Sequence, residues 1–119
     1  MPNMLKSIPK NLLTGSLRVY SGYGENCTSV TLQNVRLERR KRDENKDGVI
    51  ESKESVLCFF DCHFSSPADF DFTPRADKYI FRDGRELRLC KTETVFDGAS
   101  AHHLEITFGE DYKINAACY

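Results

Sequence analysis

Residues 36–60 read RLERRKRDENKDGVIESKESVLCFF, and this stretch decides which fold the chain adopts. Its centre, Asp43 to Glu54, fits the calcium-loop pattern D-x-[DN]-x-[DN]-G-x5-E of an EF-hand. In that interpretation the calcium ligands are Asp43, Asn45, Asp47, Val49 and Glu54, with Val49 contributing its backbone carbonyl. The same letters also suit the tip of a long β-hairpin, because Asp47 and Gly48 tolerate the positive φ of a tight turn.

Length and net charge restrict the possible classes of protein. The chain has 119 residues, which is enough for one compact domain with its own core. A formal net charge of -1 predicts neither a nucleic-acid coat nor a membrane-surface protein from bulk electrostatics. No apolar run approaches a membrane span, and Pro2 and Pro9 interrupt a start that lacks a signal-like apolar core. We therefore expect a soluble protein made in a cytosol, with no membrane contact.

The cysteines are scattered without a repeated spacing. There are five of them, Cys27, Cys58, Cys62, Cys90 and Cys118. In a reducing compartment an odd set of this kind is most simply interpreted as buried or half-buried thiols. We expect no structural disulfides.

The rest of the chain has the pattern of short antiparallel strands separated by turns. The expected strands are Leu17 to Tyr20, Thr28 to Glu38, Val56 to Phe60, Lys78 to Arg82, Glu86 to Cys90 with a continuation to Phe96, and His102 to Gly109. A one-residue slip of the apolar pattern at Gln33-Asn34 indicates a β-bulge. Asp83-Gly84 predicts a second hairpin turn. Residues 66–77 are interpreted as a surface connection whose Phe70 and Phe72 pack back onto the core.

These patterns predict one mostly β domain over residues 1–119, with a small antiparallel β-barrel or a sandwich-like fold. Residues 1–16 are an extended lead-in in this interpretation, and residues 110–119 are a C-terminal tail. One long hairpin at about residues 36–60 projects from the domain, and residues 39–55 are its arm.

The flanks of the calcium-like loop favour the hairpin. An EF-hand needs a helix on each side and usually works beside a second copy, whereas here a β-patterned segment enters the loop. Four consecutive cations, Arg39 to Arg42, would also repel the ion. We therefore expect no metal and no cofactor, and we keep a cytosolic calcium-binding module as the alternative function.

Other residues that could bind metal or catalyse do not assemble into a site. On a strand the sulfurs of Cys58 and Cys62 lie about 13 Å apart, too far to share a zinc ion with His63. If this segment were helical, the two thiols would face one another, and a metal site is therefore kept as an alternative. His102 and His103 are adjacent, so a strand sends them to opposite faces. Because no nucleophile or carboxylate pair has a serviceable spacing, we expect no enzyme.

The basic run has two interpretations. Exposed cations on a strand edge often only improve solubility and discourage edge pairing. On a hairpin that projects into a space filled by nucleic acid, they would instead contact phosphates without regard to sequence. In a ring, the acids intermixed with these cations could also pair one arm with the arm of another copy. The candidate cations of the arm are Arg39, Arg40, Lys41, Arg42, Lys46 and Lys53.

Five segments carry a further signal when they are taken in order. They are SIPKNLL at residues 7–13, VTLQNVRLE at 30–38, LCFFD at 57–61, IFRDGREL at 80–87 and HHLEI at 102–106. Together they resemble the small minor capsid proteins of tailed phages, which lie in the head-tail connector region.

The resemblance implies a structural virion protein with a head-completion or stopper role in the phage neck. Such a protein is a small β-barrel that forms a ring below the portal and its adaptor, closes the channel over packaged double-stranded DNA, and supports joining of the tail and its completion proteins. By position, Arg39 to Ser55 corresponds to the loop or hairpin that reaches the channel in similar stoppers. Assembly in the host bacterial cytoplasm, and a final location at the head-tail junction of the virion, are also implied.

Overall fold

The computed structural model describes residues 9–110, with only the backbone given for Lys10, Arg42, Glu44, Lys46, Glu51, Ser52 and Ala76. The first half of the expected N-terminal lead-in lies outside the described residues, as do Cys118 and the expected tail after Glu110. Within the described range, one turn of 3-10 helix, η1 (Lys10–Leu12), precedes the first strand. Leu13 follows this turn and is buried, so it anchors the start of the domain.

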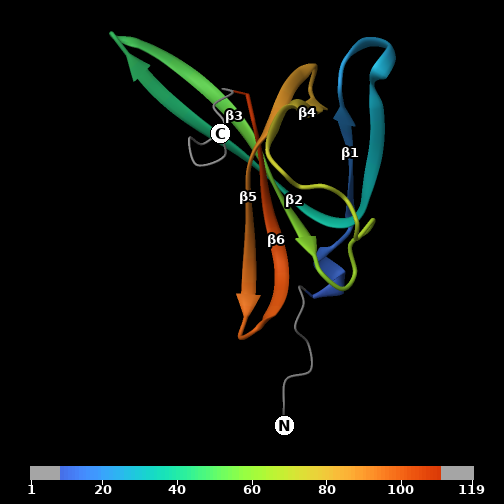
Figure 1. Cartoon of the computed structure of the whole chain (residues 1–119). Coiled ribbons are helices and arrows are strands. Elements are labelled where there is room, and N and C mark those ends of the chain that lie inside the picture. Colours follow the sequence, from blue (N-terminus) through green and yellow to red (C-terminus); the bar gives the residue numbers. More distant parts are fainter. Residues whose placement is uncertain (1–8, 111–119) are drawn as a thin grey trace.

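Six antiparallel strands form a closed barrel (Figure 1). They are β1 (Gly15–Ser21), β2 (Thr28–Lys46), β3 (Val49–Asp61), β4 (Arg75–Arg82), β5 (Arg85–Asp97) and β6 (Ser100–Gly109). The order around the barrel is β1-β2-β3-β6-β5-β4, and a short 3-10 turn, η2 (Gly24–Asn26), lies between β1 and β2. The predicted mostly β fold is confirmed, and of the two predicted architectures the barrel is the one present.

Alternate residues of every strand fill the barrel interior, as the two-residue period of a strand requires. The core consists of Leu17, Val19, Leu32, Val35, Val56, Cys58, Phe60, Ile80, Leu87, Leu89, Ile106 and Phe108. The predicted bulge in β2 is confirmed, because Gly15 pairs with Val35 while Ser16 pairs with Gln33. Asn34 is the extra residue and has a φ of 56°. The bulge keeps the apolar residues on both sides of it on the inner face.

The connection between β3 and β4 packs back onto the barrel, as the sequence predicts. The ring of Phe72 lies 4.8 Å from Phe70 and 4.8 Å from the core residue Phe60. Lys78 is buried, and its ammonium group binds the backbone carbonyl and the carboxylate of Asp71. Hydrogen bonds from Thr73 and Lys78 lower the pKa of Asp71 to about 2. Aromatic packing and an ion pair therefore fix the connection together.

The β2-β3 hairpin extends beyond the closed part of the barrel (Figure 1). Among the described residues, β2 pairs with β1 only as far as Val35, and β3 pairs with β6 only as far as Ser55. Farther out the two strands pair with each other, up to a turn at Asp47-Gly48. Both turn residues have positive φ, 53° and 82°, which is the conformation that suits two-residue hairpin turns. The predicted projecting hairpin is confirmed.

A second hairpin, formed by β5 and β6, also extends past its neighbours, and the sequence did not predict this projection. β6 pairs with β3 only as far as His103, whereas β5 and β6 continue to pair up to Asp97 and Ser100. The end of this hairpin carries Phe96, whose side chain is 62% exposed. The barrel thus has two projecting elements, which point in different directions in Figure 1.

Phe108→Ala should lower the free energy of unfolding by about 3–5 kcal/mol, because it removes a fully buried ring and leaves a cavity in the barrel. Chemical denaturation followed by circular dichroism measures the loss. Phe96→Ala is the matched control, and in dilute, monomeric protein its effect should stay within about 0.5 kcal/mol because that ring is largely in solvent. Equal losses for the two variants would contradict this core.

Candidate functional site

The candidate site is the arm, residues 39–55, which comprises the last part of β2, the turn and the first part of β3. Arg39 pairs with the core residue Val56, so the arm begins where the hydrophobic core ends. Side chains alternate between the two faces of a strand, and the basic run is therefore divided. Arg39 and Lys41 continue the inner face of the barrel wall, and Arg40 lies on the outer face. The consecutive cations are therefore divided between the two faces of the arm.

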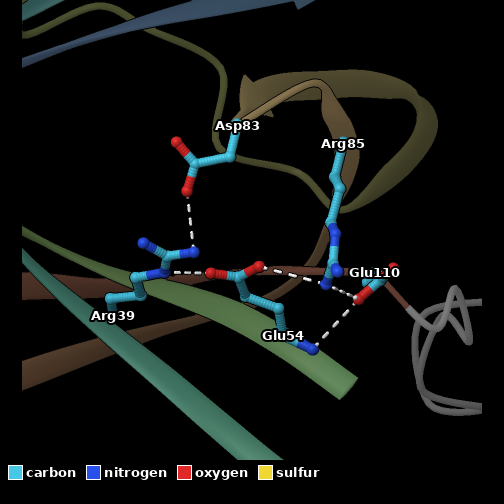
Figure 2. Close-up of polar contacts among 5 residues, drawn as sticks. All are labelled: Arg39, Glu54, Asp83, Arg85 and Glu110. Atoms are coloured by element: carbon cyan, nitrogen blue, oxygen red, sulfur yellow. Dashed lines mark hydrogen bonds and ion pairs between the residues drawn. The ribbon is translucent and has the colours of Figure 1, made fainter. Parts of the chain in front are cut away.

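A buried carboxylate holds the base of the arm to the barrel (Figure 2). The side chain of Glu54, on β3, is only 1% exposed, and its two oxygens bind two different arginines. Arg39 of β2 donates a hydrogen bond to one oxygen, and Arg85, the first residue of β5, donates to the other at 3.2 Å. Figure 2 shows the Glu54 carboxylate between these two guanidinium groups.

Two further carboxylates extend this ion network. Asp83, in the turn between β4 and β5, lies 2.7 Å from a guanidinium nitrogen of Arg39. Glu110, directly after β6, lies 3.2 Å from Arg85 and accepts a hydrogen bond of 3.1 Å from the backbone N–H of Glu54. We refer to these five residues, Arg39, Glu54, Asp83, Arg85 and Glu110, as the brace. The brace connects the arm to the β4-β5 turn and to the end of β6.

The brace also keeps Glu54 ionised. The hydrogen bond from Arg39 lowers the pKa of the Glu54 carboxyl, and the positive charges of Arg39, Arg85 and Lys41 act in the same direction. Burial acts in the opposite direction but has the smaller effect. Glu54 is therefore a carboxylate at neutral pH although it is shielded from water.

Two residues with predicted functional roles belong to the brace. Arg39 is one of the candidate cations of the channel-facing arm, and its guanidinium group is bound by Glu54 and Asp83. Glu54 is the last position of the calcium-like pattern. It pairs with Lys41, which is five residue pairs before the last pair of the hairpin, a separation of about 16 Å from the turn.

The other residues of the calcium-like pattern are spread along the outer part of the arm. Asp43 and Asn45 are exposed on β2, Asp47 is in the turn, and Val49 begins β3. The side-chain oxygen of Asn45 accepts a hydrogen bond of 3.2 Å from the N–H of Gly48, which supports the turn. Calcium ligands must all lie within about 2.6 Å of one ion, so calcium binding would require the hydrogen-bonded pairing of β2 and β3 to open. The expectation of no bound metal stays a prediction, calcium binding stays the alternative, and a calorimetric titration distinguishes them.

The remaining cations surround a groove at the base of the arm. The groove has a volume of about 510 Å³ and is lined by Arg40, Lys41, Lys53, Glu54, Ser55, Cys90, Thr107, Gly109 and Glu110. Arg40 is exposed and lies 3.2 Å from Glu38, Lys41 is exposed, and Lys53 is half-buried. The brace arginines bind both glutamates of the groove, and Arg40, Lys41 and Lys53 add positive charge to its lining. The side chains of Arg42 and Lys46 lie outside the described residues.

The sequence reasoning missed the apolar tip of the arm. Ile50 and Val49 are 71% and 60% exposed, directly after the turn at Asp47-Gly48. The available signal was the position of two β-branched residues beyond the turn, where neither face of the hairpin has a barrel behind it. The arm therefore has cations at its base and apolar side chains at its end.

The two adjacent histidines do not point to opposite faces, and this prediction was wrong. Val95 pairs with His103 and Phe96 pairs with Ala101, so His102 is the extra residue of a β-bulge. The bulge brings the two rings together, with their Nδ1 atoms 2.7 Å apart. The Nε2 atom of His103 lies 3.0 Å from Oε2 of Glu105. The prediction assumed a regular strand, and the bulge breaks the two-residue alternation.

The cysteines are dispersed over the barrel. Cys58 lies in the core, where burial raises the pKa of its thiol to about 12, and Cys62 is exposed. Cys27 and Cys90 are half-buried, and all four of these cysteines are free thiols. Among the side chains of the described residues, no group of three or more histidines, cysteines, aspartates or glutamates is arranged to hold a metal ion.

Comparisons with known proteins give no family assignment. No protein-family model, curated protein or solved structure matches this chain. Between residues 9 and 110, no helix is long and apolar enough to cross a membrane. The function must therefore be argued from the residues and their geometry.

Glu54→Gln should destabilise the protein at neutral pH, because it removes the negative charge that separates Arg39 from Arg85. The lowered pKa of Glu54 sets the direction of the pH dependence. The stability that ionised Glu54 adds to the folded protein is fully present above pH 4.5, the ordinary pKa of a glutamate carboxyl. It is lost as the pH falls through the lower pKa that Glu54 has in the folded protein. Urea unfolding of wild type and variant should therefore differ most near neutral pH, and the difference should shrink below 4.5.

Asp43→Asn is the matched control for this prediction. It removes one carboxylate from an exposed position on the same face of the arm, two residue pairs farther out. Its unfolding curve should match that of the wild type across the same pH range. If the two variants lost the same stability with the same pH profile, the brace would not be the cause.

Proposed function

We propose that this chain is a structural virion protein of a phage head-tail connector, forming a ring below the portal that closes the DNA channel and supports tail joining. The observation that carries the proposal is the arm, a self-paired hairpin that leaves a closed barrel with cations at its base and apolar residues at its tip. When several copies surround a channel, a projecting hairpin from each copy can narrow it. The resemblance of the sequence to minor capsid proteins of tailed phages supports the same role.

The cations at the base of the arm would act as phosphate contacts. Arg40, Lys41 and Lys53 line one groove, and lysine or arginine at a phosphate releases condensed counterions without regard to base sequence. A ring places the same residues around the channel once per copy, so weak individual contacts add up. This arrangement suits DNA that is held in place without being read.

The apolar tip would supply contacts between copies. In a ring whose arms point toward a common axis, Ile50 and Val49 of different copies approach one another. Burying their side chains there gives the hydrophobic gain that neither residue obtains within its own chain. The channel would then be narrowed by protein-protein contact at the axis and by charge farther out.

The brace would keep the arm at a fixed angle to the barrel. Two strands paired only with each other form a marginal, flexible ribbon. Glu54 ties this ribbon to Arg85 of β5, and Arg39 ties it to Asp83 of the β4-β5 turn. A ring of arms held in this way closes a channel of defined width.

The protein should restore function to phage heads that lack it. Purified protein added to such heads should give extra density at the portal in negative-stain images and should restore tail attachment. The absence of both effects, together with tight calcium binding in a calorimetric titration, would favour the alternative of a calcium-binding module.

Arg40→Gln combined with Lys41→Gln should increase loss of DNA from filled heads while leaving the fold intact, because it removes charge from the groove and keeps Arg39 in the brace. The fraction of packaged DNA that becomes sensitive to nuclease measures the leakage. Arg75→Gln combined with Lys91→Gln is the matched control, because it removes two exposed cations from other strands. Equal leakage from heads carrying the groove variant and the control would argue against a role of the groove.

A further inference from the structure

Four aromatic rings cluster on the outer wall of the barrel, at the seam where β4 closes onto β1. Tyr79 stacks on Tyr20 at 5.6 Å and on Tyr23 at 4.9 Å between ring centroids. Phe81 packs edge-on against Tyr20 at 5.3 Å and against Tyr79 at 5.4 Å. We refer to these four residues as the aromatic face.

The aromatic face offers more apolar surface than closing the seam requires. In the described part of the chain, β1 and β4 share two residue pairs, and the stacked rings of Tyr20 and Tyr79 belong to one of them. Phe81 and Tyr23 lie outside that pair and remain 54% and 51% exposed. Aromatic side chains with a large exposed area are typical anchors of protein interfaces.

Charged residues with a positive balance surround the aromatic face. Arg18 lies two residues before Tyr20 on the same face of β1 and is exposed. On the neighbouring strand β5, Arg88 pairs with Tyr79 and Glu86 pairs with Phe81. Glu86 is shared, because it accepts a hydrogen bond from Tyr23 at 2.9 Å and lies 3.2 Å from Arg88. A second acid near Tyr23, Asp77 of β4, is bound by Arg75 at 2.7 Å.

The end of the β5-β6 hairpin has the complementary character. Phe96 is 62% exposed there, next to the turn that joins the two strands. Three carboxylates lie toward this end of the hairpin, and one cation of β5 is near them: Lys91 binds Glu93 at 2.6 Å, Glu105 lies 3.0 Å from His103, and Asp97 ends β5. An exposed ring with an acidic surround therefore faces solvent on one element, and exposed rings with a basic surround face solvent on another.

We propose that the aromatic face of one copy binds the β5-β6 hairpin end of a second copy, with Phe96 packed against Phe81 and Tyr23. The two surfaces lie on different parts of the barrel, so the contact is head-to-tail, and contacts of this type generate closed rings or filaments. The assignment of this contact to the side-by-side packing of copies in the connector ring rests on the proposed function. The contact itself is a property of the isolated protein and can be tested without phage heads.

The test is a mixing experiment with the single variants Phe81→Ser and Phe96→Ser. Each variant lacks one half of the contact, so each alone should remain monomeric where the wild type assembles. A mixture of the two retains one intact contact, between Phe96 of one chain and the aromatic face of the other. It should form a dimer that grows no further. Light scattering after size-exclusion chromatography gives the masses.

Three further measurements keep this test decisive. Circular dichroism establishes that both variants are folded. Arg18→Glu changes the surround of the aromatic face without touching a ring, and it should raise the concentration needed for assembly at least about tenfold, more so at low salt. Val30→Ser removes an exposed apolar side chain outside both surfaces and should assemble like the wild type.

Several results would overturn the proposed contact. They are a wild-type protein that is monomeric at about 1 mM, variants that assemble as well as the wild type, or a mixture that stays monomeric. Each of these leaves the connector role to the experiments on phage heads. Conversely, dimers in the mixture together with no binding to heads would leave the contact intact and remove the connector role.

Discussion

The orientation of the arm depends on one buried carboxylate. Removing Glu54 from water is unfavourable unless opposite charges and hydrogen bonds compensate for the lost hydration. One compensating arginine, Arg39, belongs to the arm, and the other, Arg85, belongs to the barrel. Both arginines can therefore compensate for the lost hydration of Glu54 only when the arm is in one position relative to the barrel. An apolar residue at this position would bury a similar area with much less directional preference, so the charge mainly selects a geometry.

The arm needs this constraint because little else holds it. Outside the barrel its strands satisfy each other's backbone groups but have no hydrophobic layer, and two-stranded ribbons are marginally stable in water. Each strand also presents an open edge, which in other proteins invites unwanted strand pairing. Exposed charged residues such as Arg40, Lys41 and Asp43 oppose such pairing. The basic run thus protects the edge as well as lining the groove.

Local sequence signals predicted most of the fold, and long-range contacts explain what they missed. Alternating apolar residues and two Asp-Gly turns located the hairpins, and the slip at Asn34 located a bulge, because these features are written within a few residues. The brace could not be found in this way, since Arg85 is 31 residues from Glu54 and Glu110 is 56 residues from it. The same limit explains the two histidines, whose bulge depends on how β6 registers against β5. Glu54 was recognised as a special carboxylate, but its partners were not.

The exposed apolar residues of this barrel have a distribution that folding alone does not explain. Ile50 and Phe96 lie at the ends of projecting hairpins, where no part of their own chain covers them, and Phe81 lies on the barrel wall. Single exposed hydrophobic residues are common on protein surfaces, and scattered ones need no explanation. Here, however, the apolar side chains that are more than half exposed lie toward the ends of two hairpins and within a cluster of stacked rings. Because the chain's own folding leaves more than half of each of these side chains in water, burying the rest would gain hydrophobic free energy only against another surface. Projecting hairpins place apolar side chains beyond the barrel wall. This arrangement suits a subunit that must contact its neighbours and also reach into the space between them.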